Sequence, residues 1–257
     1  MKSESLFRAT MMAALFLLAS RASAQNNTVS LKIDLVAWGN DIPGLSIKAG
    51  SKNDEVTALA FQYSKDIAYS GSNVLEIYQR AGVQTVPADS KEAVIKDAIP
   101  PELLALRKEK PDLVALAQLP ADSKRVTILL APAQDHTFRA VVIDDDPSKL
   151  PPGKLRIHNY SPVPVALRCN GAPPKELKGR ESMVTAPNNH QVIYELAYQD
   201  QGQWKMQENN ILRVGDDEQA QMIILKSDSG YFTGTNGTRS GFLQAVVLRR
   251  QKEAPAP

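Results

Sequence analysis

Four aromatic residues are the best candidates for contact with a ligand. Tyr194 and Tyr198 lie on the same face of an expected strand, Trp204 follows them closely, and Trp38 precedes the turn sequence Gly39-Asn40-Asp41. Aromatic rings on a β-sheet can stack on sugar rings, but they also fill cores. We therefore treat the four as candidate ligand contacts, with core packing as the competing interpretation.

Catalytic motifs are missing from the sequence. It contains no Gly-x-Ser-x-Gly string, no phosphate-binding glycine-rich loop and no His-Glu-x-x-His zinc motif. The three histidines, His136, His158 and His190, are far apart, and His158 falls at a position of an alternating strand that we expect to face solvent. The single cysteine, Cys169, shares a strand face with apolar residues, which favours a buried structural role. We predict no catalytic residue, no cofactor and no metal.

Two acidic clusters, residues 144–146 and 216–218, could offer oxygen atoms to a structural calcium ion. Neither cluster has the spacing of an EF-hand loop. A solvated turn between strands is the interpretation that we favour for both.

The N-terminus has the order of a secretory signal peptide. Lys2 and Arg8 precede an apolar run at 11–19, and the small residues of Ala22-Ser23-Ala24 follow it. The run is about half the roughly 20 residues that a membrane-spanning helix needs. We expect cleavage before Gln25, secretion or a periplasmic location, and no transmembrane anchor.

Removal of this signal changes the charge balance. The whole chain has 30 Lys and Arg and 28 Asp and Glu; the signal holds three of the former and one of the latter, which leaves 27 of each. Nucleic-acid binders usually carry a basic excess. We therefore expect no nucleic-acid partner.

Alternation of apolar and polar residues predicts an all-β fold. It recurs at 29–35, 45–49 and 165–169, while 126–130 and 222–225 are apolar on both faces and are typical of central strands. The exception is a helical region near 90–110. Asp89 and Glu92 have capping-box spacing before 91–98, and Pro101 suits the first position of a helix over 102–110. A long ordered loop is the alternative there.

The acidic, proline-rich stretch 144–153 is the best domain boundary. The segments on either side are similar: Leu31-Lys32-Ile33-Asp34 resembles Leu155-Arg156-Ile157-His158, and both segments close with a strand pair. We predict two tandem Ig-like β-sandwiches and consider an internal duplication, to be rejected if the strand orders differ. The predicted parts are a signal peptide at 1–24, an N-terminal sandwich at 25–146, a linker at 147–153, a C-terminal sandwich at 154–250 and a disordered tail at 251–257.

Residues 153–171 have the pattern of a strand, Asn159-Tyr160-Ser161-Pro162, a second strand and Asn170-Gly171. This pattern resembles the opening hairpin of uncharacterised exported bacterial β-sandwich proteins, and it is weakly similar to that of periplasmic accessory proteins of exopolysaccharide acetylation of the alginate type. The resemblance implies an Ig-like sandwich and an envelope location. It implies no catalytic residue.

These observations favour a secreted or periplasmic, non-enzymatic binding or scaffolding protein of the cell envelope, with an envelope protein or a polysaccharide as partner. Two alternatives stay open. One is a glycan-acting envelope enzyme with carboxylates from distant loops, which would need a cleft with paired acids. The other is a structural matrix protein that self-assembles through sheet edges.

Overall fold

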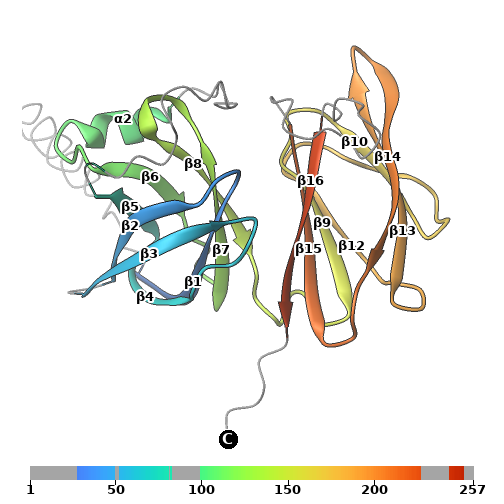
Figure 1. Ribbon diagram of the computed structural model, residues 1–257, viewed down its shortest axis with the longest axis horizontal. Helices are drawn as coiled ribbons and strands as arrows, with labels where there is room; N and C mark the ends of the chain where they lie inside the picture. The colour runs from blue at the N-terminus through green and yellow to red at the C-terminus, as the bar shows by residue number, and fades with distance from the viewer. Residues whose placement is uncertain (1–27, 50–51, 81, 83–98, 227–242, 252–257) are drawn as a thin grey trace, which may run out of the picture.

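The protein is mostly β-sheet, arranged in two halves that lie side by side (Figure 1). The structure, a computed structural model, describes residues 28–49, 52–80, 82, 99–226 and 243–251. The predicted signal peptide, the predicted helical turns at 91–98 and residues 252–257 of the predicted tail lie outside these ranges. Within them, no helix has the length and apolar character to cross a membrane.

Among its described residues, the N-terminal half contains eight strands, one short helix and one 3-10 turn. In chain order these are β1 (Thr28–Ala37), β2 (Ile42–Ala49), β3 (Lys52–Ala60), β4 (Ile67–Ser72), β5 (Val74–Gln79), α2 (Pro101–Arg107), β6 (Leu113–Gln118), β7 (Arg125–Pro132), η1 (Gln134–His136) and β8 (Phe138–Asp144). One row of strands pairs as β3-β2-β5-β6 and the other as β4-β1-β7-β8. A short parallel contact between β1 and β3, with Val36 opposite Leu59, joins the rows into one curled sheet.

In the part of the C-terminal half that the structure describes, eight strands form two separate sheets. They are β9 (Lys154–Asn159), β10 (Val165–Cys169), β11 (Lys175–Leu177), β12 (Ser182–Thr185), β13 (Gln191–Asp200), β14 (Gln203–Arg213), β15 (Glu218–Lys226) and β16 (Leu243–Gln251). One sheet has the order β11-β10-β13-β14 and the other has the order β12-β9-β15-β16.

The two halves pair their strands in the same pattern. Apart from the β1–β3 contact, which has no counterpart between β9 and β11, each strand from β1 to β8 has the neighbours and directions of the strand eight numbers later, including the parallel pairs β1–β7 and β9–β15. The irregularity in register is repeated too, between Ile77 and Tyr78 on β5 and between Leu196 and Ala197 on β13. The strand orders therefore do not reject an internal duplication, which stays a prediction.

Each half has its own apolar core, and the alternating strands supply it as the sequence predicts. Ile33 and Leu35 of β1 point into the first core, and Ile157 of β9 and Leu167 of β10 point into the second. The predicted central strands β7 and β15 are buried on both faces. Burying an Ile or Leu side chain contributes about 1.5–3 kcal/mol. These core side chains therefore hold the two layers of each half together.

A third apolar cluster lies between the halves. Val36 and Leu129 from the N-terminal half pack with Ile223, Leu225 and Leu248 from the C-terminal half. These residues alternate with the core residues, so they lie on the opposite faces of β1, β7, β15 and β16. The row β4-β1-β7-β8 therefore packs face to face with the equivalent sheet β12-β9-β15-β16 (Figure 1), and the rows β3-β2-β5-β6 and β11-β10-β13-β14 lie outside.

Helix α2 begins at Pro101, as predicted, and ends at Arg107. Proline suits this first position because its missing N–H would have no partner there. Leu103 of the helix is fully buried against Leu113 of β6, and Leu106 and Leu116 pack beside them. The helix thus covers one end of the outer row (Figure 1).

Two predictions about exposure are wrong. His158 was expected to face solvent but is buried, because its strand face is covered by the N-terminal half. The acidic residues 144–146 were expected to form a solvated turn, yet Asp145 and Asp146 are buried. In the predicted linker 147–153, Leu150 is buried, whereas residues 147–149 and 151 are exposed. The stretch 144–153 is a tight turn in which Lys149 and Leu150 donate backbone hydrogen bonds to the Asp146 carbonyl.

Candidate functional site

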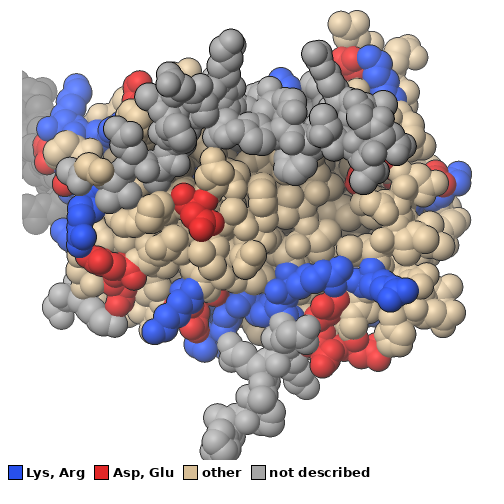
Figure 2. Space-filling model, viewed as in Figure 1, with Lys and Arg blue, Asp and Glu red and all other residues tan. Residues whose placement is uncertain are grey.

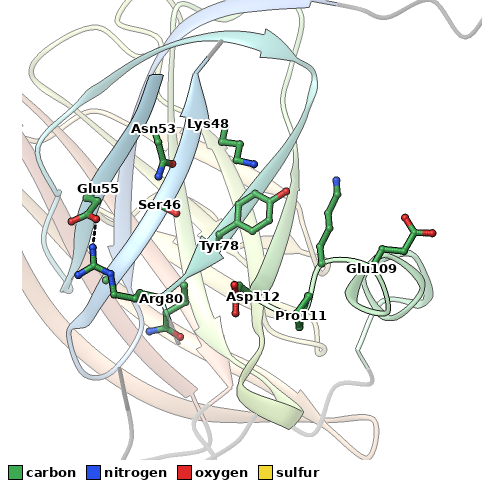
Figure 3. A pocket seen from close by; sticks show the side chains of 12 residues that line it. Ser46, Lys48, Asn53, Glu55, Tyr78, Arg80, Glu109, Pro111 and Asp112 are labelled. Atoms are coloured by element: carbon green, nitrogen blue, oxygen red, sulfur yellow. Dashed lines mark hydrogen bonds and ion pairs between the residues drawn. The ribbon is translucent and has the colours of Figure 1, made fainter. Parts of the chain in front are cut away.

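A polar groove of about 490 Å³ opens on the outer face of the N-terminal half (Figure 3). Its floor is the outward-facing side of β2, β3 and β5, where Ser46, Lys48, Asn53 and Tyr78 lie. Its wall is the segment that follows α2, including Lys110 and Asp112. Strand alternation supplies the floor, since Leu45 and Ile47 turn inward to the core between the outward-facing residues.

An ion pair fixes the aromatic residue of this groove. Lys110 Nζ lies 2.7 Å from both carboxylate oxygens of Glu76, and the Tyr78 hydroxyl donates a hydrogen bond to the same carboxylate. Burial opposes ionisation of Glu76, but these two donors outweigh it and hold its pKa below the usual value. Burial and the neighbouring carboxylate raise the pKa of Tyr78. Glu76 is therefore a carboxylate that positions Tyr78, not a proton donor.

Other charges line the groove in open surroundings. Arg80 donates to Glu55 at the far end, and both side chains are largely exposed. Lys48 Nζ lies 5.2 Å from the centre of the Tyr78 ring, within range of a cation–π contact. The groove thus presents an ammonium group, an amide, a hydroxyl and an aromatic ring side by side, which suits a ligand rich in hydroxyl groups.

The outer face of the C-terminal half is different in character. Ile193 of β13 and Trp204, Met206 and Ile211 of β14 expose 46–63% of their surface. Ile193 lies opposite Ile211 in the sheet, so the pair forms a cross-strand apolar contact in the open. These residues lie on one face of the sheet and along its edge strand, β14.

The structure does not bring the four predicted aromatic contacts together. Trp38 is buried between the halves, with its ring 5.3 Å from Phe61 in an edge-to-face contact. Tyr194 lies in the C-terminal core, where its hydroxyl donates to Glu208 at 2.7 Å, and Tyr198 packs against the same core. Burial removes Trp38 and Tyr194 from the set of ligand contacts, and Trp204 is the one with an exposed ring.

A buried polar cluster joins the halves. Arg250 Nη2 lies 2.8 Å from Asp34 Oδ2 and 2.9 Å from Asp145 Oδ2, and its guanidinium covers the Tyr63 ring at 3.9 Å. Arg125 Nη1 reaches Asp34 at 3.3 Å. Burial raises the pKa of Asp34, and the two guanidinium groups oppose that rise. The cluster draws on positions far apart in the chain, which is why no sequence motif marks it.

His158 belongs to the same cluster. Its Nε2 lies 2.8 Å from Gln221 Oε1, its ring stacks on Tyr160, and the Gln221 amide donates to Asp145. Burial lowers the pKa of His158 to about 4. A hint was available in the sequence, because His158 and Asp34 hold the same place in the two similar strand openings.

At least one carboxylate in each acidic cluster accepts hydrogen bonds from the protein itself. Asp146 accepts hydrogen bonds from the Lys124 and Ser148 amides, and Glu218 accepts from Gly215 and Arg249. In the part of the chain that the structure describes, no group of three His, Cys, Asp or Glu residues is arranged to hold a metal ion.

Comparison with other proteins adds no relative to this picture. A scan of the chain against known protein families finds no family that matches, and a search among characterised proteins also finds no match.

Proposed function

We propose that this chain is a secreted or periplasmic, non-enzymatic binding protein of the cell envelope, built as two tandem Ig-like sandwiches, and that its groove binds envelope polysaccharide. The groove on the N-terminal outer face carries this proposal. It combines a held aromatic ring, Tyr78, with the polar groups of Lys48 and Asn53 in an open cleft of about 490 Å³. Sugar units offer hydroxyls to such groups and a flat apolar face to a ring.

The repeated strand pattern supports the tandem arrangement, and the predicted signal peptide supports export. The resemblance of residues 153–171 to exported sandwich proteins points to the same compartment. Figure 2 shows basic side chains of one face lying beside acidic ones, which favours a neutral partner over a polyanion such as a nucleic acid.

The buried cluster between the halves supports a scaffolding role. Asp34, Arg250 and Asp145 link strands of both halves, so the two outer faces are held at fixed positions on opposite sides of the molecule. A rigid body of this kind can present a groove on one side and a different surface on the other.

The enzymatic alternative gains no specific support. Glycoside hydrolysis needs an acid with a raised pKa beside the substrate. Glu76, which contacts the groove residues Tyr78 and Lys110, has a lowered pKa, and Glu55 of the groove is paired with Arg80. Asp34, whose pKa is raised, is shielded by the contact between the halves. The described residues therefore fit a binder better than a hydrolase.

Affinity electrophoresis tests the proposal. The purified protein is run through gels that contain polysaccharide extracted from the source envelope, and we expect its migration to be retarded. The double variant Lys48→Ala/Asn53→Ala removes two exposed groove side chains and should weaken binding about tenfold or more.

The matched control is Lys175→Ala/Gln203→Ala, which removes an exposed lysine and an exposed amide from the C-terminal outer sheet. It should bind as the wild type does. Equal retardation of the groove variant and the wild type, or no retardation of either, would rule out the groove as a polysaccharide site.

A further inference from the structure

Strand β14 is a long, exposed sheet edge. It runs for 11 residues, from Gln203 to Arg213, at the end of the order β11-β10-β13-β14, and nearly all of its residues are exposed or half-buried. In the described ranges it pairs with β13, Leu212 packs against the core, and the Gln207 side chain bonds both backbone groups of Leu243 on β16. Exposed edges of this length are templates for pairing with another strand.

The equivalent strand of the N-terminal half is covered. Leu113 of β6 and Met206 of β14 each lie at the first pair after the repeated register shift, so they hold equivalent positions. Leu113 is 0% exposed because Leu103 of helix α2 packs on it, whereas Met206 is 63% exposed. The described residues place no counterpart of α2 over β14, so among them the surface around Met206 is uncovered.

The backbone of β14 is oriented to accept a new strand. The Ile211 amide donates at 2.8 Å to the side chain of its neighbour Asn210 and not to β13. Its antiparallel partner Ile193 likewise bonds away from β14, with its amide donating to Asn170. The backbone amide and carbonyl groups of every second residue, counted from Ile211, point to the same side. A row of these groups therefore faces outward along the edge.

A second copy of the same strand fits this edge in an antiparallel register. With the two-fold axis at the bulge near Gln207, Trp204 lies opposite Ile211 of the second copy, and Met206 lies opposite its Asn209. These four residues all lie on the outer face, so the side chains that meet are on the same side of the joined sheet. The bulges of the two strands then meet at the axis, and the regular arms on either side pair with each other.

The charges of β14 are compatible with this register. Lys205 lies opposite Asn210 of the second copy, and Glu208 lies opposite its Gln207, so no like charges face each other. Directly opposed like charges would destabilise a strand pair. The apolar row Ile193–Ile211 is continued by Trp204 of the second copy, which shields part of the exposed surface of both.

We infer that two copies of this chain associate through β14, which joins their outer C-terminal sheets into one eight-stranded sheet. This contact leaves the groove free, because the groove lies on the other half. It gives the protein two grooves per dimer, and it is independent of what the groove binds.

Sedimentation velocity over a range of protein concentrations tests this inference. We expect a concentration-dependent monomer–dimer equilibrium for the wild type. Because of the two-fold symmetry, Ile211→Asp places an acid opposite Trp204 at two equivalent positions of the dimer. It should weaken dimerisation about tenfold or more. Asn209→Pro removes an outward amide without touching the β13 ladder and should abolish the dimer.

Val184→Asp is the matched control, because Val184 is an equally exposed aliphatic residue on the edge strand β12 of the other sheet. It should dimerise as the wild type does, and circular dichroism checks that each variant is folded. A wild type that stays monomeric at all concentrations overturns the inference, as does a dimer that Val184→Asp weakens as much as Ile211→Asp does. The monomeric Ile211→Asp variant should still bind polysaccharide, so failure of dimerisation can be distinguished from failure of binding in the groove.

Discussion

The N-terminal and C-terminal halves share one strand pattern but differ in how they treat their outer sheets. In the first half, helix α2 seals the β6 edge and its following segment forms one wall of a polar groove. In the second half the corresponding sheet is open, and its apolar residues Met206 and Ile211 remain exposed. The insertion that carries α2 thus creates a cleft in one copy of the fold and leaves a free edge in the other.

The inner sheets differ in their buried polar residues, because the two sheets pack against each other. Asp34 on β1 and His158 on β9 hold the same place in the two similar strand openings, yet one is an acid facing two arginines and the other a neutral imidazole facing Gln221. Two identical acids in a face-to-face contact would repel each other, so the difference lets equivalent surfaces pack. Divergence on the inner faces lets the halves pack, and divergence on the outer faces gives one half a groove and the other an exposed edge.

The largest effect is expected from removing the cation of the buried cluster. Arg250→Ala leaves Asp34 and Asp145 without their shared partner, and breaking such a buried pair typically costs about 3–5 kcal/mol. Urea unfolding measures the loss. Arg249→Ala, next in sequence and partly exposed on Glu218, should cost about 1 kcal/mol. Equal losses for the two variants would mean that the cluster does not hold the halves together.

The equivalent positions Leu113 and Met206 give the next largest effect and test the contrast between sealed and open edges. Leu113→Ala removes a fully buried side chain beneath α2 and should cost about 3 kcal/mol. Met206→Ala changes an exposed position and should stay within about 0.5 kcal/mol in the monomer. Both are measured by urea unfolding at a concentration where the protein is monomeric. A large loss for Met206→Ala would show that something covers β14 in the monomer.

A pH effect of intermediate size is expected from His158. Its pKa is about 4 in the folded protein, because of burial, and about 6.5 when unfolded. The unfolded chain therefore binds a proton first as the pH falls, so the free energy of unfolding should drop by about 2 kcal/mol from this residue between pH 7 and pH 5. The contribution is present above pH 6.5 and is lost towards pH 4.

The variant His158→Gln isolates that contribution, since carboxylates also titrate at low pH. Its free energy of unfolding should fall less steeply than that of the wild type over the same range. Parallel curves for the two proteins would place His158 in contact with solvent, as the alternation of its strand first indicated.

Alternation explains both what could be predicted from the sequence and where prediction failed. It identified β1, β2 and β10 and the double-sided burial of β7 and β15, because periodicity depends on local packing alone. It could not tell that the second face of β9 is also covered, since that cover comes from another part of the chain. The burial of Asp145 has the same origin, because its partner Arg250 belongs to the last strand.

The groove could not be predicted from the sequence either. Tyr78 and Lys110 lie on different elements, and they meet because β5 and β6 pair and the segment after α2 runs beside them. Of the aromatic residues chosen from the sequence, Tyr194 and Tyr198 pack on the core, Trp38 lies between the halves, and Trp204 is exposed on the other half from the groove. Tyr78 carries no local pattern to distinguish it. Spacing along the chain shows only which residues are neighbours in sequence. A binding surface depends on which faces the folded chain leaves exposed.

The smallest expected effect compares two ion pairs at equivalent positions. Glu76 and Glu195 both precede the repeated register shift, and they pair with Lys110 and Arg168 respectively. Lys110 contacts both oxygens of a carboxylate that Tyr78 also contacts, so Lys110→Ala should cost about 0.5–1 kcal/mol. Arg168 reaches Glu195 at 3.3 Å in a more exposed setting, so Arg168→Ala should cost less than about 0.5 kcal/mol. Urea unfolding at low and high salt distinguishes them, since only the first loss should persist when charges are screened. A larger cost at Arg168 would mean that the second half, not the first, depends on its outer charges.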